Sequence, residues 1–139
     1  MKYLLAVLLF ITASAFTAVS LKPVDADEAV TFTIKNFGLN TDGELKGLKG
    51  SIQWDAANPA ASSFNITVDV HTINTGIESR DKHLKKKEYF DADTYPVISF
   101  KSTAVTTAQV TGSLSIKGIT KIISFPFKST VLIPCSEES

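Results

Sequence analysis

The sequence predicts an all-β domain of antiparallel strands that close into a barrel or a sandwich. Three observations support this prediction. Six segments alternate apolar and polar residues with the period of two that is typical of half-buried strands. Short separators rich in Gly, Pro, Asn and Asp divide these segments. The chain has 139 residues, 44% of them hydrophobic, which suits one domain with a buried core.

Each of the six segments places its apolar residues on one face. The segments are residues 29–37, 46–54, 63–70, 97–102, 109–118 and 122–131. Their apolar faces, in the same order, hold Val30, Phe32 and Ile34; Leu48, Ile52 and Trp54; Phe64, Ile66, Val68 and Val70; Ile98 and Phe100; Val110, Leu114 and Ile116; and Ile123, Phe125, Phe127 and Val131. Strands with one apolar and one polar face are typical of an antiparallel sheet with one solvated side.

The separators between the strands contain turn-forming residues. Residues 40–43 (NTDG), 55–62 (DAANPAAS) and 117–120 (KGIT) are therefore expected to be turns or loops. Three glycines, Gly47, Gly50 and Gly112, fall inside predicted strands. Glycine at such positions indicates the bends and bulges that a closing barrel needs.

Residues 1–20 have the layout of a secretory signal peptide. Lys2 supplies the positive start, residues 4–11 (LLAVLLFI) supply the apolar stretch, and small residues follow. We expect cleavage after Ser20, with Ala15 as the alternative, and a periplasmic or secreted domain of residues 21–139. The apolar run is shorter than the ~20 residues of a membrane span, so no span is expected in the mature chain. A buried N-terminal helix is the competing interpretation.

Charge and cysteine content narrow the function classes. The 14 basic and 14 acidic side chains cancel, so no overall field draws the chain to nucleic acid or to an anionic membrane. Cys135 is the single cysteine, which excludes an intramolecular disulfide, and stability must come from packing. No basic neighbour would activate its thiol, so catalysis by Cys135 is not expected.

Residues 76–96 (GIESRDKHLKKKEYFDADTYP) interrupt the alternating pattern with charge and helix-forming residues. Glu78 precedes Lys82 by four residues and Asp81 precedes Lys85 by four, and both pairs favour a helix. Residues 75–78 (TGIE) have the spacing of a capping box. We therefore expect a short helix over residues 78–88 that connects two strands.

Three chemical functions compete with a purely connecting role for this segment. Catalysis would use Arg80, Asp81 and His83, but no serine can be placed beside His83 from the sequence. A metal site would use His71, Asp69, Asp81 and His83, which lack the spacing of known metal motifs. Nucleic-acid binding would use the run of three lysines, which is short and followed by an acid. A solvated connector is favoured over each of them.

Four segments of the chain, taken in order, resemble the YceI family. They are residues 30–55, 55–76, 79–103 and 110–127, and the likeness extends over about residues 25–131. The most distinctive of them is SRDKHLKKKEYFDADTYPVISFKST. Its matching residues are Arg80, Asp81, His83, Leu84, Phe90, Asp91, Tyr95, Pro96, Phe100 and Ser102.

This resemblance implies an eight-stranded antiparallel barrel of lipocalin-like shape with an apolar tunnel. It also implies that the tunnel holds a long-chain amphiphile such as a polyisoprenoid, an isoprenoid quinone or a fatty amide, with no catalysis, no metal and no cofactor other than that ligand. About six strands are predicted here, so the two C-terminal strands of the family are expected to be missing. The barrel would then stay open at an edge, where a homodimer could form.

The residues expected to bind the ligand are the apolar face of the strands and three charged residues at the rim. They are Phe32, Ile34, Ile52, Trp54, Phe64, Ile66, Val68, Val70, Ile98, Phe100, Leu114, Ile116, Phe125, Phe127, Arg80, Asp81 and His83. The three charged residues could equally pin the connector. Two other functions stay open: a secreted hydrolase or isomerase that uses His71 or His83, and an interaction module that pairs through the open edge.

Overall fold

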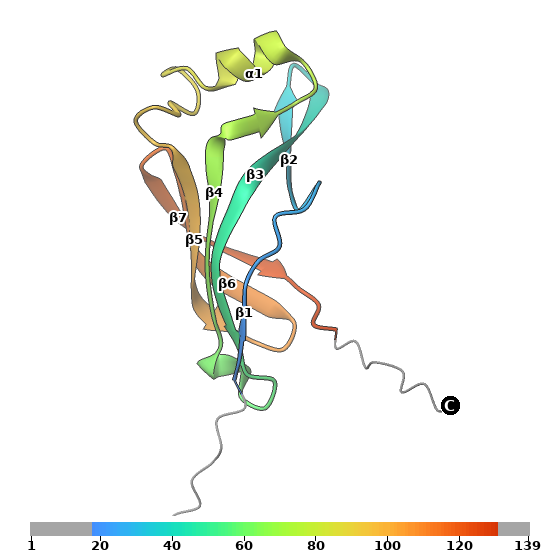
Figure 1. Ribbon diagram of the computed structural model, residues 1–139, viewed down its shortest axis with the longest axis vertical. Coiled ribbons are helices and arrows are strands. Elements are labelled where there is room, and N and C mark those ends of the chain that lie inside the picture. Colours follow the sequence, from blue (N-terminus) through green and yellow to red (C-terminus); the bar gives the residue numbers. More distant parts are fainter. Residues whose placement is uncertain (1–17, 131–139) are drawn as a thin grey trace, which may run out of the picture.

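The computed structural model describes residues 18–130 as one curled antiparallel sheet with a short helix across one end (Figure 1). The all-β fold class predicted from the sequence is confirmed. Six of the strands correspond to the predicted segments, and a seventh of three residues precedes them. The strands are β1 Val19–Leu21, β2 Val30–Asn36, β3 Leu39–Trp54, β4 Ser63–Asn74, β5 Val97–Val105, β6 Gln109–Ile116 and β7 Ile119–Pro126. A 3-10 turn, η1, covers Pro59–Ala61, and the helix α1 covers Glu78–Leu84.

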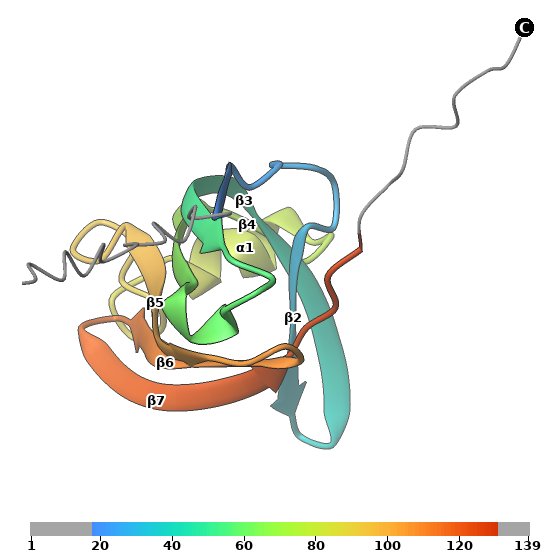
Figure 2. The same ribbon diagram turned by 90° about the horizontal axis from the view of Figure 1, so that it is seen from below.

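The sheet is arranged in the order β1-β3-β4-β5-β6-β7, and β2 pairs with β3 on the same side as β1. Seen from below, the sheet curls until β7 curves back toward β2 (Figure 2). Within residues 18–130, β7 pairs with β6 alone, so the barrel is not closed. The expected cleavage point between Ser20 and Leu21 falls inside β1. Most of the expected signal peptide, and Cys135, lie outside the described residues.

Two hairpins are closed by two-residue turns with positive φ at both positions. Phe37 and Gly38 have φ values of 49° and 79°, and Lys117 and Gly118 have 50° and 72°. Such turns match the twist of the flanking strands. The turn expected within residues 117–120 is confirmed, but the turn expected at residues 40–43 is wrong. Those residues belong to β3, because their backbone pairs with β2.

Bulges bend β3 and β4 in the middle of the sheet. The register shifts on both sides of Lys46, and Gly47 has a φ of 74° there. The bulge expected at Gly47 is confirmed. Because it adds one residue, Leu45 and Leu48 both pack in the same core cluster although they are three residues apart. A bulge also lies opposite Gly112, where Lys101 O would be 2.4 Å from an added Cβ.

The helix α1 is shorter than the predicted helix over residues 78–88, since it ends at Leu84. The expected capping box does not form, because Ile77 is the N-cap and makes no side-chain hydrogen bond. Glu78 and Lys82 form the expected ion pair at 2.8 Å. The carboxylate of Asp81 does not pair with Lys85 among the described contacts. It accepts hydrogen bonds from Thr75 N and Oγ1 instead, at 2.8 and 2.6 Å.

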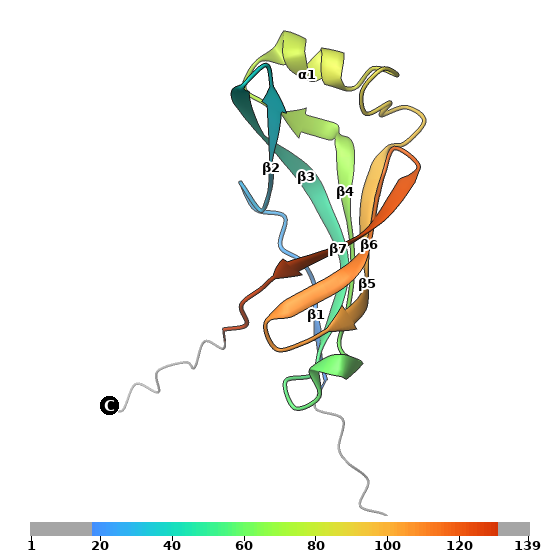
Figure 3. The same ribbon diagram turned by 180° about the vertical axis from the view of Figure 1, so that it is seen from behind.

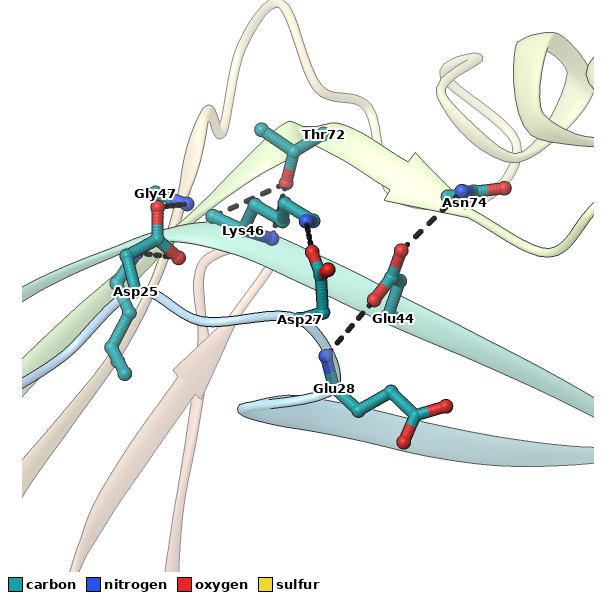
Figure 4. Close-up of polar contacts among 9 residues, drawn as sticks. Asp25, Asp27, Glu28, Glu44, Lys46, Gly47, Thr72 and Asn74 are labelled. Carbon is teal, nitrogen blue, oxygen red and sulfur yellow. Dashed lines mark hydrogen bonds and ion pairs between the residues drawn. The ribbon is translucent and has the colours of Figure 1, made fainter.

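The segment before β2 is fastened to β3 at the bulge (Figure 4). The carboxylate of Asp25 accepts hydrogen bonds from the backbone N–H groups of Gly47 and Leu48, at 3.1 and 3.2 Å. Asp27 forms an ion pair with Lys46. The hydrogen bond that Lys46 Nζ donates and the charge attraction of that ammonium lower the pKa of Asp27, and the same hydrogen bond to the Asp27 carboxylate raises the pKa of Lys46. These contacts satisfy backbone donors that the bulge leaves without strand partners.

Two separate clusters of buried side chains form the core. The upper cluster, under α1, is defined by Leu45, Val68 and Ile73, with Phe32, Leu84, Phe90 and other apolar residues packed against it. The lower cluster is defined by Phe100, Val105 and Val110, with Trp54, Phe64, Phe127 and others against it. In the lower cluster, Phe127 meets Trp54 and Phe64 edge to face, with ring centroids 5.4 and 5.6 Å apart. Buried side chains therefore fill the interior at the upper and the lower cluster and do not form one continuous core.

Candidate functional site

The inner face of the curled sheet encloses a cavity of about 660 Å³, which we call the inner cavity. It is bordered by residues of both core clusters. Its lining residues are Ala29, Val30, Thr31, Phe32, Thr33, Ile34, Leu45, Val68, Phe90, Ile98, Leu114, Ile116, Ile123 and Phe125. Most of the lining comes from β2 and the residue before it and from β6 and β7, with single residues from β3, β4, β5 and the connector, so the cavity reaches the seam where the sheet does not close.

Two further hollows share lining residues with the inner cavity. A side recess of about 200 Å³ lies against β4 and β5 and includes Ile66, Ile98 and Phe100. The mouth, a wider opening of about 840 Å³, lies at the α1 end. Leu114 and Ile123 line all three spaces. The three spaces therefore meet at these two side chains.

The mouth is formed by three parts of the chain that meet at the end of the sheet where α1 lies (Figure 3). They are the β2–β3 turn with Phe37, the connector between β4 and β5 (residues 75–96) with Leu84, Tyr89 and Phe90, and the turn of the β6–β7 hairpin with Lys117.

The connector is held against the β6–β7 turn. Lys117 Nζ donates a hydrogen bond to the backbone oxygen of Lys87 at 2.8 Å. The ring of Tyr95 lies so close to Gly118 that an added Cβ would be 2.9 Å from it. These two contacts fix one side of the opening.

The fourteen apolar residues predicted to bind ligand fall into two groups, those that line the hollows and those that do not. Nine of them line the inner cavity or the side recess: Phe32, Ile34, Ile66, Val68, Ile98, Phe100, Leu114, Ile116 and Phe125. The other five, Ile52, Trp54, Phe64, Val70 and Phe127, are absent from the linings of these spaces. Trp54, Phe64 and Phe127 pack in the lower cluster instead. Their contact with a ligand remains a prediction.

The three charged residues predicted at the rim lie at the start of the connector and line none of these spaces. Arg80 donates from Nε to Thr75 Oγ1 and from Nη2 to Thr75 O, both at 2.7 Å. Asp81 accepts two hydrogen bonds from the same Thr75. His83 packs against Tyr89, with ring centroids 4.9 Å apart. The arrangement joins α1 to the end of β4, and a role of these residues in binding a head group stays a prediction.

The residues considered for catalysis or metal binding are dispersed. The backbone N–H of His71 donates to the Asp69 carboxylate at 2.8 Å, and its Nε2 lies 3.9 Å from the carboxylate of Asp93. Residues 18–130 contain no group of three or more His, Cys, Asp or Glu side chains placed to hold a metal ion. Over the same residues, no helix is both long and apolar enough to cross a membrane.

Sequence reasoning missed several lining residues. Phe90 and Leu84 come from the connector, where no strand period applies, and only the fold brings them over the cavity. Ile123 shares the alternating face of Phe125 and Phe127, so the strand pattern itself was sufficient to find it. Leu45 lies between the turn expected at residues 40–43 and the strand expected over residues 46–54, so no strand face was assigned to it.

Comparisons with known proteins agree with this geometry. A family model described as the YceI-like domain matches residues 21–135. A protein named Protein YceI from Salmonella arizonae is 32% identical to this chain over 132 residues, which cover 91% of this chain and 69% of the relative. The protein of the same name from Salmonella paratyphi B matches to the same extent.

Solved structures are also similar to this chain. BcnA from Burkholderia cenocepacia aligns with a TM-score of 0.67 and 29% identity, over 73% of this chain and 67% of that one. A YCEI protein from Campylobacter jejuni aligns with a TM-score of 0.57 and 28% identity, over 76% of this chain and 67% of that one. These likenesses support the lipocalin-like form of the curled sheet.

Proposed function

Since this chain belongs to the YceI-like domain family, we propose that it binds a long-chain amphiphile in its inner cavity, outside the cytoplasm and without catalysis. The ligand class that the family resemblance implies is a polyisoprenoid, an isoprenoid quinone or a fatty amide. The observation that carries the proposal is the set of three largely apolar hollows, the inner cavity, the side recess and the mouth, which share Leu114 and Ile123 in their linings.

The size and the chemistry of the hollow suit a hydrocarbon tail. A space of about 660 Å³ corresponds to on the order of 20 groups of water size at about 30 Å³ each. Each methylene taken out of water contributes about 0.8 kcal/mol. A tail can therefore bind tightly without specific polar contacts, and the polar end is left to determine which amphiphile is chosen.

A hollow of this size with an apolar lining is unusual in a folded protein. Protein interiors are packed about as densely as organic crystals, and voids larger than a water molecule are few. Side chains that face a void lose the dispersion contacts they would otherwise make. An apolar occupant would restore those contacts, so ligand binding is expected to stabilise the fold.

The proposal is tested on protein purified from the compartment to which it is exported. Organic extraction followed by mass spectrometry should yield an isoprenoid or fatty lipid in about one copy per chain. Lipid-free protein should then take up an isoprenoid quinone or a fatty amide saturably, with a rise in the melting temperature. Lipid-free protein from cells, together with no saturable uptake of either probe, would contradict the proposal.

Among residues 18–130, no strand pairs with the outer edge of β7, and this edge supports a second candidate function, self-association through β7. Ile119 and Ile122 on this strand are 61% and 64% exposed. A long edge strand with exposed apolar residues is a template for pairing with another chain. A homodimer that pairs β7 with β7 is the simplest such assembly, because the same surface serves both copies. Sedimentation velocity over a range of concentrations tests it, and a monomer at all of them would contradict it.

A further inference from the structure

Among the described residues, the charged side chains that line the mouth are all of one sign. Lys35, Lys117 and Lys121 belong to its lining, and neither Asp nor Glu does. The net charge of the whole chain is zero, so this local excess is not the result of a basic protein. The other lining residues of the mouth are apolar except for the Tyr89 hydroxyl. The mouth therefore combines an apolar wall with positive charge.

Lys121 breaks the pattern of its own strand. Ile119, Lys121 and Ile123 all line the mouth, whereas Ile122 between them is 64% exposed. Lys121 is thus the one charged residue on a face of β7 whose other members are Ile119, Ile123 and Phe125. It lies opposite Leu114, which lines all three hollows. A departure from a consistent local pattern is expected mainly at functional sites.

Acidic side chains gather elsewhere on the molecule. A polar recess of about 490 Å³ between β2, β3 and the end of β4 is lined by Glu28, Asp42 and Glu44 and by no Lys or Arg. The charged side chains that line the mouth and the polar recess are therefore opposite in sign. An anion would be drawn to the mouth and repelled from the polar recess.

We propose that the amphiphile is an isoprenoid or fatty lipid with an anionic head, a phosphate or a carboxylate, in place of a neutral quinone or amide, and that Lys121 binds this head at the mouth with Lys35 and Lys117 beside it. The inference rests on the proposed function, since the tail is taken to occupy the inner cavity. An ammonium group has three donors. Lys117 uses one of them on the backbone oxygen of Lys87, so two remain for a ligand. Hydrogen bonds from a charged donor to a charged acceptor are about twice as strong as neutral ones.

The proposal predicts that head charge alone changes the affinity. Geranylgeranyl phosphate and geranylgeraniol share one tail, and palmitate and hexadecanol share another. Each pair is titrated into lipid-free protein. The phosphate and the carboxylate should bind on the order of tenfold more tightly than their alcohols. This advantage should shrink as salt is added, because the mouth is open to solvent.

Variants then assign the effect to Lys121. Lys121→Met keeps most of the apolar stem and removes the charge. It should weaken geranylgeranyl phosphate on the order of tenfold and leave geranylgeraniol within about twofold. Lys121→Arg should retain the preference. Lys101→Met is the matched control, since Lys101 is an exposed lysine on β5 that lines none of the hollows, and it should change neither affinity.

The possible outcomes separate this inference from the proposed function. If neither the phosphate nor the alcohol binds, the proposed function fails and the inference fails with it. If both bind equally and Lys121→Met changes neither, the cavity binds tails but the anionic head is refuted. If Lys121→Met weakens both probes to the same extent, Lys121 acts through packing, and the inference is again refuted. Increased self-association of Lys121→Met with an unchanged head preference would assign Lys121 to guarding the β7 edge and would also refute it.

Discussion

Ile123 and its neighbour Ile122 permit a direct test of whether a tail passes through the junction of the three hollows. Ile123 lines all of them, whereas Ile122 is 64% exposed on the other face of β7. Replacing each with tryptophan makes the same chemical change at adjacent positions. Ile123→Trp fills the junction, and Ile122→Trp puts the indole in solvent.

The size of the effect follows from the volume that the indole occupies. Tryptophan has about six more non-hydrogen atoms than isoleucine. If about half of them take space that the tail would fill, the indole displaces on the order of three methylenes at about 0.8 kcal/mol each. The loss of about 2.4 kcal/mol is on the order of 50-fold in affinity. Because the indole enters an existing hollow, the cost in stability should be less than the 1–3 kcal/mol or so that is typical of overpacking.

The assay is a titration of lipid-free protein with an isoprenoid quinone, followed by displacement of a fluorescent fatty-acid analogue. Ile122→Trp should bind as the unchanged protein does, and Ile123→Trp about 50-fold more weakly. Denaturant unfolding of both variants shows whether the fold is retained. Equal affinities of two folded variants would refute the reasoning, because the tail would then lie somewhere other than the junction.

Three other predictions concern the stability and the self-association of the fold. Asp55→Ala should destabilise the domain by about 2 kcal/mol in urea unfolding, because Asp55 Oδ1 accepts hydrogen bonds from the N–H groups of Ala57 and Asn58 at 3.0 Å each. Asp55→Asn retains an acceptor and should cost less, and equal losses of stability in the two variants would contradict this reasoning. The lowered pKa of Asp27 means that its ion pair with Lys46 stabilises the fold above the ordinary pKa of 3.8 and is lost as the pH falls through the lower folded value. Urea midpoints measured from about pH 7 to pH 2 should therefore fall slightly more for the unchanged protein than for Asp27→Asn, and parallel curves would show that the pair contributes nothing. Self-association through β7 should be reduced by Ile122→Lys, as measured by sedimentation velocity, and an unchanged dimer would place the interface elsewhere.

The strand pattern could be predicted from the sequence because alternation along a half-buried strand is a local property. It identified six of the seven strands within residues 18–130, and the connector between β4 and β5 stood out by its charge. The three-residue β1 is too short to show a period. The β2–β3 turn was misplaced because residues 40–43 have turn-like composition. Gly43 instead makes room for the ring of Phe32, whose Cζ would be 2.4 Å from an added Cβ.

The division of the apolar face into filled and hollow parts could not be predicted, because alternation says which face is inward but not what occupies the interior. Ile66 and Phe64 lie on the same face of β4, yet Ile66 borders the side recess and Phe64 packs edge to face with Phe127. Which of them meets a cavity depends on ring positions in other strands. The same holds for Phe90, which the connector brings over the cavity from outside the strand pattern.

The unpaired seam between β2 and β7 links ligand binding to self-association in physical terms. The inner cavity is lined from both sides of this seam, so a tail in the cavity contacts two strands that do not pair with each other. A second copy that pairs with β7 would cover the same region from outside. If the tail and the partner copy favour the same curvature of the sheet, binding of one raises the affinity of the protein for the other by an equal factor. If they favour different curvatures, binding of one lowers that affinity by an equal factor. If both proposals hold and either curvature preference exists, ligand binding and dimer formation are coupled through β7, because Ile123 lines the cavity from the same strand whose edge a partner would use.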